Sequence, residues 1–326
     1  MTVKKAELHV HLEGTIRPAL AKMLAQRNQL TLPANLITAD EQSYSYPDFL
    51  GFLNAFDEVA AVIKHPQDYY DLTFDYLKAN AKENTIYVEM MYSPQHAELS
   101  SGIPSREHLQ AIVQAIDDAE AKFNIISRII IVAVRHFGAD AATKVAKQAL
   151  KENVPYIVGF GLGGDEVNFP PRLFSKAYQI ASEGGLHCTV HAGEFAPASG
   201  MLEAMEYLPI ERIGHGIQAM HSIETIAQLK ERNIALEICP SSNIALGLFS
   251  DMLSHPLTQL RAAGIKLSLG SDDPPFFRTT LANEYHLVQE AYQYSDKEME
   301  HFTAMAINSS FADKQTKLKL ANLLAG

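Results

Sequence analysis

The stretch KAELHVHLEGTIRP, residues 5–18, carries two histidines, His9 and His11, within a short apolar run. Side chains alternate between the two faces of a β-strand, so both imidazoles project from one face and Val10 projects from the other. This arrangement can offer two ligands to one metal ion. An isolated pair of this kind fits two ordinary surface histidines equally well, so motifs further along the chain decide between the two interpretations.

The chain continues as a regular alternation of predicted strands and helices. The predicted strands cover residues 85–91, 126–134, 156–161, 187–192, 212–215, 235–238 and 266–270. Helices are predicted at residues 106–123, 139–152, 171–183, 201–208, 222–232 and 256–263. With the first strand this makes eight strands, and their continuous apolar character is typical of parallel strands buried on both faces. The pattern predicts the α/β class and a single-domain (β/α)8 TIM barrel over residues 1–326.

Residues 12–84 form a long helical insertion between the first and second strands. Helices are predicted at residues 18–28, 46–63 and 66–83, with an irregular segment at 30–45. An insertion directly after a ligand-bearing strand is typical of a lid over an active site. Phe49, Leu50 and Leu53 recur at helical spacing, which fits either such a lid or ordinary core packing. The tail, residues 297–326, adds further helix.

Composition and charge exclude several classes of function. The formal net charge is −11 and Lys and Arg form no cluster, which argues against nucleic acid as a partner. Cys188 and Cys239 both fall in predicted strands, so a reducing compartment fits better than a disulfide framework. The N-terminus leaves no room for a signal peptide, and the longest apolar stretch, residues 125–134, is too short for a bilayer. These features predict a soluble cytoplasmic protein, without a prediction of its oligomeric state.

Polar side chains follow several of the predicted strands where those strands end. They are His9 and His11 after the first strand, His191 after the fifth, His215 after the sixth, and Asp272 and Asp273 after the eighth. In a TIM barrel, catalytic groups gather at this face. Three histidines and one aspartate, with water completing the shell, suit a catalytic Zn²⁺ ion, although another divalent transition metal could use the same set. Such an ion would activate water by lowering its pKa to about 7.

Three further side chains complete the predicted chemistry. Glu194 stands three residues after His191 in the motif HAGE, and a partly dry site favours its neutral form, which suits a proton donor. His215 is either a fourth imidazole ligand or an electrostatic partner of the attacking hydroxide, and both roles stay open. Asp272 and Asp273 point to opposite sides if strand geometry persists, so that one faces the metal and the other the substrate.

Motifs in a consistent order along almost the whole chain resemble those of one known family. They are KAELHVHLEG, PDFL, YVEMMYSP, Arg135-His136, GGDE, HAGE, RIGHG, CPSSN and SDDPPFFRTTLANEY. Together they are similar to the adenosine deaminase family of metal-dependent aminohydrolases. The resemblance implies one zinc ion per chain, bound by His9, His11, His191 and Asp272.

The resemblance also implies a reaction at a small-molecule purine. Glu194 would protonate N1 while hydroxide attacks C6, and His215 with Asp272 would orient that hydroxide. Ammonia would then leave and give the 6-oxopurine. The implied substrate contacts come from His11, Glu13, the backbone N–H of Gly164 at N3, Asp273 at N7, and an apolar cover of Phe49, Leu50 and Leu53.

Two features bear on which purine is the substrate. Members of the family that act on adenosine usually carry Asp at position 13 to contact the ribose, whereas those that act on adenine tend to have Glu, as here. The run PFFRTTLANEY, residues 275–285, is instead similar to the adenosine type and lacks the glycine pair of the adenine type. We predict an adenosine and 2′-deoxyadenosine deaminase of purine salvage, with adenine or another 6-aminopurine derivative as the alternative substrate.

Three other functions fit the sequence less well. Binuclear barrel hydrolases bridge two ions with a carboxylated lysine on the fourth strand, but residues 156–161 contain no lysine. Cytidine-deaminase zinc sites combine H-x-E with P-C-x-x-C, and only the first half occurs, at residues 96–98. A catalytically silent purine-binding barrel predicts the loss of a metal ligand or of the proton donor, and both are present.

Overall fold

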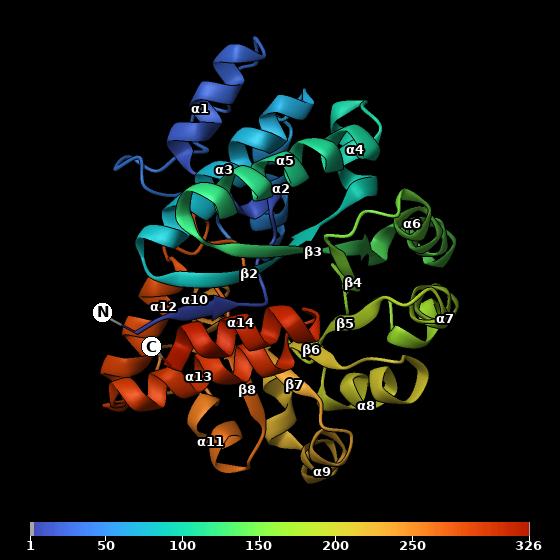
Figure 1. Cartoon of the computed structure of the whole chain (residues 1–326), viewed down its shortest axis with the longest axis vertical. Helices are drawn as coiled ribbons and strands as arrows, with labels where there is room; N and C mark the ends of the chain where they lie inside the picture. Colours follow the sequence, from blue (N-terminus) through green and yellow to red (C-terminus); the bar gives the residue numbers. More distant parts are fainter. Residues whose placement is uncertain (1–2, 326) are drawn as a thin grey trace.

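Eight parallel strands form a ring at the centre of the molecule in the computed structural model, which describes residues 3–325 (Figure 1). The strands follow one another around the ring in sequence order. They are β1 Lys5–Glu7, β2 Thr85–Tyr92, β3 Ile126–Val134, β4 Ile157–Gly163, β5 His187–Ala192, β6 Arg212–His215, β7 Ala235–Ile238 and β8 Lys266–Leu269. A parallel bridge between Val10 and Asp272 joins the chain just beyond β1 and β8. This confirms the predicted (β/α)8 barrel.

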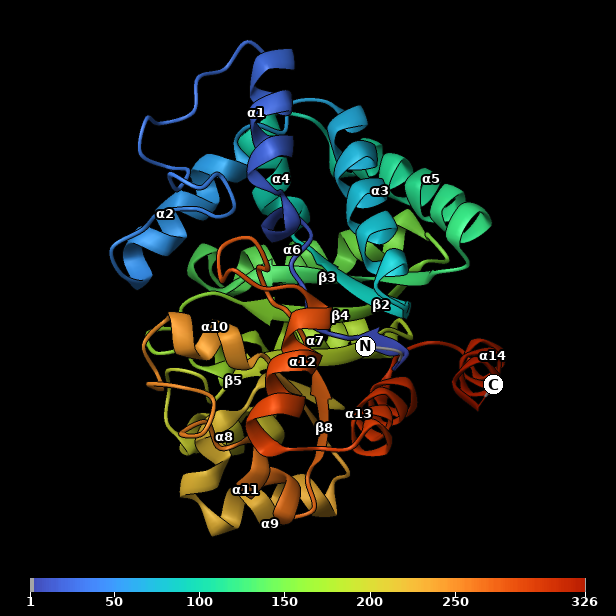
Figure 2. The same cartoon turned by 90° about the vertical axis from the view of Figure 1, so that its left-hand side faces the viewer.

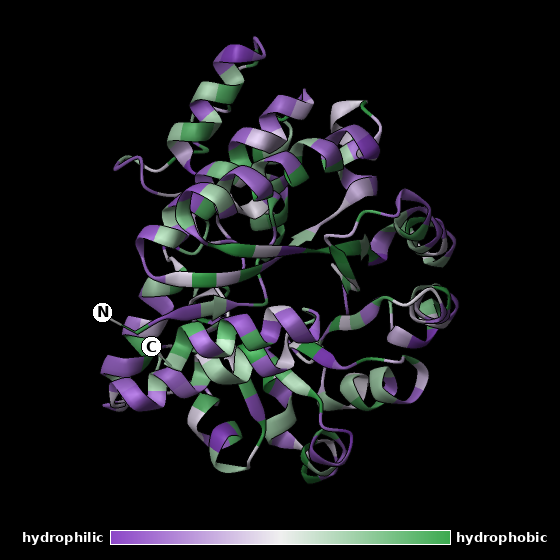
Figure 3. Ribbon diagram, in the orientation of Figure 1, coloured by the Kyte–Doolittle hydropathy of each residue, from purple (hydrophilic) through white to green (hydrophobic). Residues whose placement is uncertain are grey.

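Helices surround the strands on the outside of the ring. They are α1 Pro18–Arg27, α2 Phe49–Ala60, α3 Pro66–Lys82, α4 Pro94–Ser101, α5 Ser105–Phe123, α6 Ala139–Glu152, α7 Ser175–Glu183, α8 Ala198–Tyr207, α9 Ile223–Glu231, α10 Pro240–Ala245, α11 Leu257–Ala262, α12 Leu281–Tyr292, α13 Asp296–Ser309 and α14 Lys314–Ala325. Figure 3 shows hydrophobic and hydrophilic residues alternating along these helices, as expected for helices that pack on a barrel with one face. No helix within residues 3–325 is long and apolar enough to cross a lipid bilayer.

The structure differs from the predicted elements at the first strand and at three helices. Strand β1 ends at Glu7, so His9 and His11 lie beyond it. Single backbone hydrogen bonds continue the pairing there, from Asp272 N–H to His9 O and from His11 N–H to Asp272 O. Helices α4, α10 and α12 are not among the predicted helices.

The insertion after β1 is fastened to the loop that follows β8. The Ser43 hydroxyl donates to Pro275 O at 2.7 Å, and the Tyr46 hydroxyl donates to Phe276 O at 2.9 Å. The Phe52 ring of α2 packs on Phe277 with ring centroids 5.1 Å apart. Figure 2 shows α1 and α2 together at one end of the molecule, far from α9 and α11. These contacts hold α2 against the barrel.

Candidate active site

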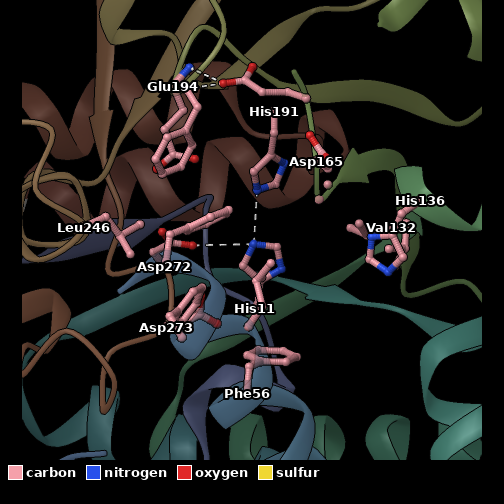
Figure 4. Close-up of a pocket in the computed structure, with 18 of the residues that line it drawn as sticks. His11, Phe56, Val132, His136, Asp165, His191, Glu194, Leu246, Asp272 and Asp273 are labelled. Atoms are coloured by element: carbon pink, nitrogen blue, oxygen red, sulfur yellow. Dashed lines mark hydrogen bonds and ion pairs between the residues drawn. The ribbon is translucent and has the colours of Figure 1, made fainter. Parts of the chain in front are cut away.

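A cavity of about 480 Å³ lies where α2 meets the carboxyl ends of the strands. The predicted site residues that line it are His11, Phe49, Leu50, Leu53, Gly164, His191, Glu194, His215, Asp272 and Asp273. Figure 4 shows His11, His191 and Asp272 directed toward one another, with Asp273 beside them. Leu50 is 69% exposed, so most of its side chain faces solvent at the rim. The barrel therefore gathers residues from distant segments, as the sequence predicts.

Three residues of this lining, His11, His191 and Asp272, converge with His9 at the spacing of ligands around one ion. His11 Nε2 lies 3.1 Å from His191 Nε2. Asp272 Oδ1 lies 3.6 Å from His9 Nε2 and 3.5 Å from His11 Nε2. Donor atoms bound tetrahedrally at about 2.1 Å from an ion are roughly 3.4 Å apart. His9 Nε2 is buried without a hydrogen-bond partner among the described residues, so the set fits a metal ion.

Two of the candidate ligand histidines are oriented by groups on their other ring nitrogens. His9 Nδ1 lies 2.7 Å from Glu237 Oε2, and His191 Nδ1 lies 3.1 Å from Leu162 O. Such contacts fix the tautomer and leave Nε2 available to a metal ion. Glu237 forms an ion pair with buried Arg212 at 2.6 Å. Although burial opposes its charge, Arg212 and His9 hold the pKa of Glu237 below the usual value.

Two site residues have left-handed backbone conformations. The φ of His215 is 59° and that of Asp272 is 63°, and each costs about 1–3 kcal/mol outside glycine. Strand geometry therefore does not persist at Asp272, and the predicted alternation does not explain why Asp272 and Asp273 face different groups. Gly14 makes room for Asp273, because a Cβ at Gly14 would lie 1.7 Å from Asp273 Oδ1.

Glu194 is placed to exchange a proton at the edge of this cluster. Its Oε1 accepts a hydrogen bond from Asn243 Nδ2 at 3.1 Å and lies 3.5 Å from His215 Nδ1. Burial raises the pKa of Glu194 well above its usual value, and the neighbouring Asp272 raises it further. The protonated carboxyl is the form that a proton donor requires.

The loop that carries Glu194 is held by residues that the sequence did not identify as functional. The Glu166 carboxylate accepts hydrogen bonds from the backbone N–H groups of Gly193, Glu194, Phe195 and Ala196. Buried Arg135 donates to His191 O at 2.5 Å on the other side of the loop. Both residues belong to motifs that resemble the family, and this resemblance was the one indication in the sequence that they matter. Their partners could not be read from one sequence.

Glu13 lies outside the cavity wall. Its side chain is buried, and the Tyr69 hydroxyl donates to its Oε1 at 3.0 Å. Burial raises the pKa of Glu13, so this carboxyl belongs to a closed contact with α3. The contact between Glu13 and the substrate stays a prediction; in this structure the carboxyl meets the Tyr69 hydroxyl.

Known proteins are similar to this chain over nearly its full length. A family model described as adenosine deaminase matches residues 4–326. The chain belongs to the adenosine deaminase family. A family member from Rhizobium leguminosarum bv. trifolii, named adenine deaminase, is 38% identical over 318 residues, with 98% of each chain covered.

Three solved structures in the adenosine deaminase family resemble the whole chain. An adenine deaminase from Arthrobacter aurescens is 33% identical, with a TM-score of 0.93 over 99% of this chain and 98% of that one. A Burkholderia ambifaria amidohydrolase with bound zinc is 26% identical, with a TM-score of 0.88 and coverage of 99% and 93%. Arabidopsis ADAL complexed with IMP is 25% identical, with a TM-score of 0.86 and coverage of 99% and 96%.

These members of the adenosine deaminase family favour our alternative substrate over the first. The names of these relatives support deamination of a purine and favour adenine as the substrate. They give no support to adenosine as the substrate. The run at residues 275–285 had pointed to adenosine. In the structure, Phe276 and Phe277 of this run pack on Phe52 of α2, with ring centroids 5.6 and 5.1 Å apart. These two rings of the run thus hold α2 against the barrel, and Phe277 also lines the cavity.

Proposed function

We propose that this protein is a zinc-dependent adenine deaminase that converts adenine and water to hypoxanthine and ammonia. The observation that carries the proposal is similarity over the full length to proteins named adenine deaminase, in sequence and in structure. Zinc is supported by the ligand spacing and by the relative with bound zinc. The two free, buried cysteines support the cytoplasmic location predicted from the sequence.

The walls of the cavity fit an uncharged planar base better than a nucleotide. Its lining within residues 3–325 contains no Lys or Arg, and it includes the acidic residues Asp57, Asp165 and Glu166. Phosphate recognition normally uses Arg or Lys, so a nucleotide would lack a counter-charge here. Phe49 and Phe195 supply aromatic surface with ring centroids 4.5 Å apart. These features suit a free purine.

The proposed mechanism assigns a role to each group around the reacting carbon. An ion bound by the three histidines and Asp272 would supply Lewis acidity that lowers the pKa of water. Glu194 would donate its proton to N1 as C6 is attacked. This proton would neutralise the negative charge that the attack would otherwise place on the ring. His215 would orient the attacking oxygen. The Gly164 N–H would donate to N3, and a protonated Asp273 would donate to N7.

Helix α2 is the proposed lid. Phe49 covers the cavity by its contact with Phe195. Asp57 at the other end of α2 lies 2.9 Å from His96 Nε2 of α4. Although burial opposes the charge of His96, the hydrogen bond to Asp57 raises the pKa of His96. The helix thus bridges the opening on two sides and would exclude water during the reaction.

The test is ammonia release by purified, zinc-loaded protein from adenine, adenosine, 2′-deoxyadenosine and AMP. We expect the highest kcat/KM for adenine by at least about tenfold, the effect of roughly 1.4 kcal/mol in the transition state. Elemental analysis of the same protein should give one metal ion per chain. A preference for adenosine over adenine would overturn the substrate proposal and leave the chemistry of deamination in place.

A further inference from the structure

Asn243, the last residue of the motif CPSSN, lies directly behind the proposed proton donor. It is fully buried. Its Nδ2 lies 3.1 Å from Glu194 Oε1 and 3.4 Å from His215 Nδ1. Its Oδ1 lies 3.2 Å from Nε2 of His255, which is also buried. One amide therefore contacts two proposed catalytic side chains on one side and a histidine on the other.

A backbone group fixes the direction of every hydrogen bond in this chain of contacts. The N–H of Leu257 can only donate, and it donates to His255 Nδ1 at 3.2 Å. His255 Nδ1 is therefore an acceptor, so the neutral ring carries its proton on Nε2 and donates it to Asn243 Oδ1. The amide nitrogen of Asn243 must then face Glu194 and His215, because its oxygen is already occupied.

The amide nitrogen of Asn243 has two protons, one for each catalytic neighbour. One is donated to Glu194 Oε1 and the other to His215 Nδ1. An acceptor role for His215 Nδ1 leaves the ring proton on Nε2. That nitrogen lies 3.9 Å from Asp272 Oδ2. The two N–H groups of the Asn243 amide thus orient the Glu194 carboxyl and fix the tautomer of His215.

We propose that Asn243 and His255 are positioning residues that hold Glu194 and His215 in their reactive arrangement. The proposal rests on the proposed deaminase function. Burial supports it, because it lowers the pKa of His255 to about 4 and keeps the ring neutral. The Phe249 ring, 5.0 Å from that of His255, restricts the imidazole further. Neither positioning residue lines the cavity.

The test compares zinc-loaded variants in the ammonia assay. Asn243→Ala should lower kcat by roughly 10–100-fold while KM changes less than about threefold, because a group that acts on the transition state lowers kcat. His255→Gln keeps a donor and an acceptor on one side chain and should stay within about threefold of the parent. His255→Leu removes both and should lower kcat by about tenfold. Ser242→Ala, a buried neighbour whose hydroxyl has no partner among the described residues, is the control.

A second readout separates positioning from folding and from the choice of substrate. Nitrogen-15 NMR of histidine-labelled, zinc-loaded protein should show His215 protonated on Nε2 in the parent and redistributed in Asn243→Ala. Unchanged kcat in Asn243→Ala, or equal losses in His255→Gln and His255→Leu, would overturn the proposal. Loss of bound zinc in the Asn243 or His255 variants would also overturn the proposal. If the parent prefers another purine, the comparison is made on that purine, so failure of the substrate proposal remains a distinct result.

Discussion

Replacing Glu166 by Gln should disrupt the active-site loop without touching a metal ligand or the proposed substrate contacts. Glu166 Oε1 accepts from the N–H groups of Glu194, Phe195 and Ala196, and Oε2 accepts from that of Gly193 at 2.9 Å. Hydrogen bonds to a charged acceptor are each worth about 1 kcal/mol more than neutral ones. The Gln amide would also place a donor against the Gly193 N–H, which costs about 1–3 kcal/mol when the group is left unsatisfied.

Three weakened hydrogen bonds and one unsatisfied N–H together would cost the loop roughly 4–6 kcal/mol of local stability. A displacement of Glu194 by about 1 Å could lower catalysis by about 100-fold. We therefore expect Glu166→Gln to lower kcat at least tenfold, with unchanged metal content. The assay is ammonia release, combined with elemental analysis and thermal unfolding.

The matched control for this prediction is Glu203→Gln. Glu203 accepts from the half-exposed Arg172 at 2.7 Å, and ion pairs at the surface contribute about 0–1 kcal/mol. The kcat of Glu203→Gln should equal that of the parent protein. A Glu166→Gln protein with kcat within twofold of the parent would show that the four backbone contacts do not position Glu194, and the reasoning would be wrong.

Four further changes have defined outcomes. Glu194→Gln should retain its metal and lose about 10²–10⁴-fold in kcat, and near-normal turnover would exclude Glu194 as the proton donor. His191→Ala should lose metal by elemental analysis, whereas a fully metallated variant would contradict its role as a ligand. Gly14→Ala should sharply reduce kcat/KM because its Cβ would lie 1.7 Å from Asp273 Oδ1, and parent-like kinetics would show that Asp273 can move freely. Burial lowers the pKa of His108 from 6.5 to about 4. Its neutral form therefore stabilises the fold fully above about pH 6.5, and this contribution, roughly 3 kcal/mol, is lost as pH falls toward 4. Thermal unfolding of His108→Gln should depend less on pH in that window, and an unchanged profile would refute this assignment.

The sequence predicted the barrel because buried parallel strands have a distinct apolar pattern. Segments such as β3 and β5 were located with the bounds found in the structure. Strand β1 was overestimated because its apolar pattern continues past Glu7, although regular pairing does not. Helix α12 was missed although Thr280 caps it by accepting from Asn283 N–H.

The site residues that the sequence could predict were those whose chemistry is visible in the residue type. Histidines and carboxylates at strand ends identified the candidate metal ligands and Glu194. Residues that act through partners were not visible, because their roles depend on contacts between distant segments. Glu237, inside the apolar strand β7, is the clearest example, since its importance follows from its ion pair with Arg212 and its contact with His9.

The seam at Val10 and Asp272 has a consequence for synthesis of the chain on the ribosome. Backbone hydrogen bonds at this seam join His9 and His11 to Asp272. His9 leaves the exit tunnel before β2 to β8, and Asp272 follows only after these strands have been translated. Until then, the outer edge of the first strand lacks its neighbour, and a nascent chain with an unpaired edge is prone to aggregate. Binding of a metal ion by all four candidate ligands must therefore wait until Asp272 has been translated.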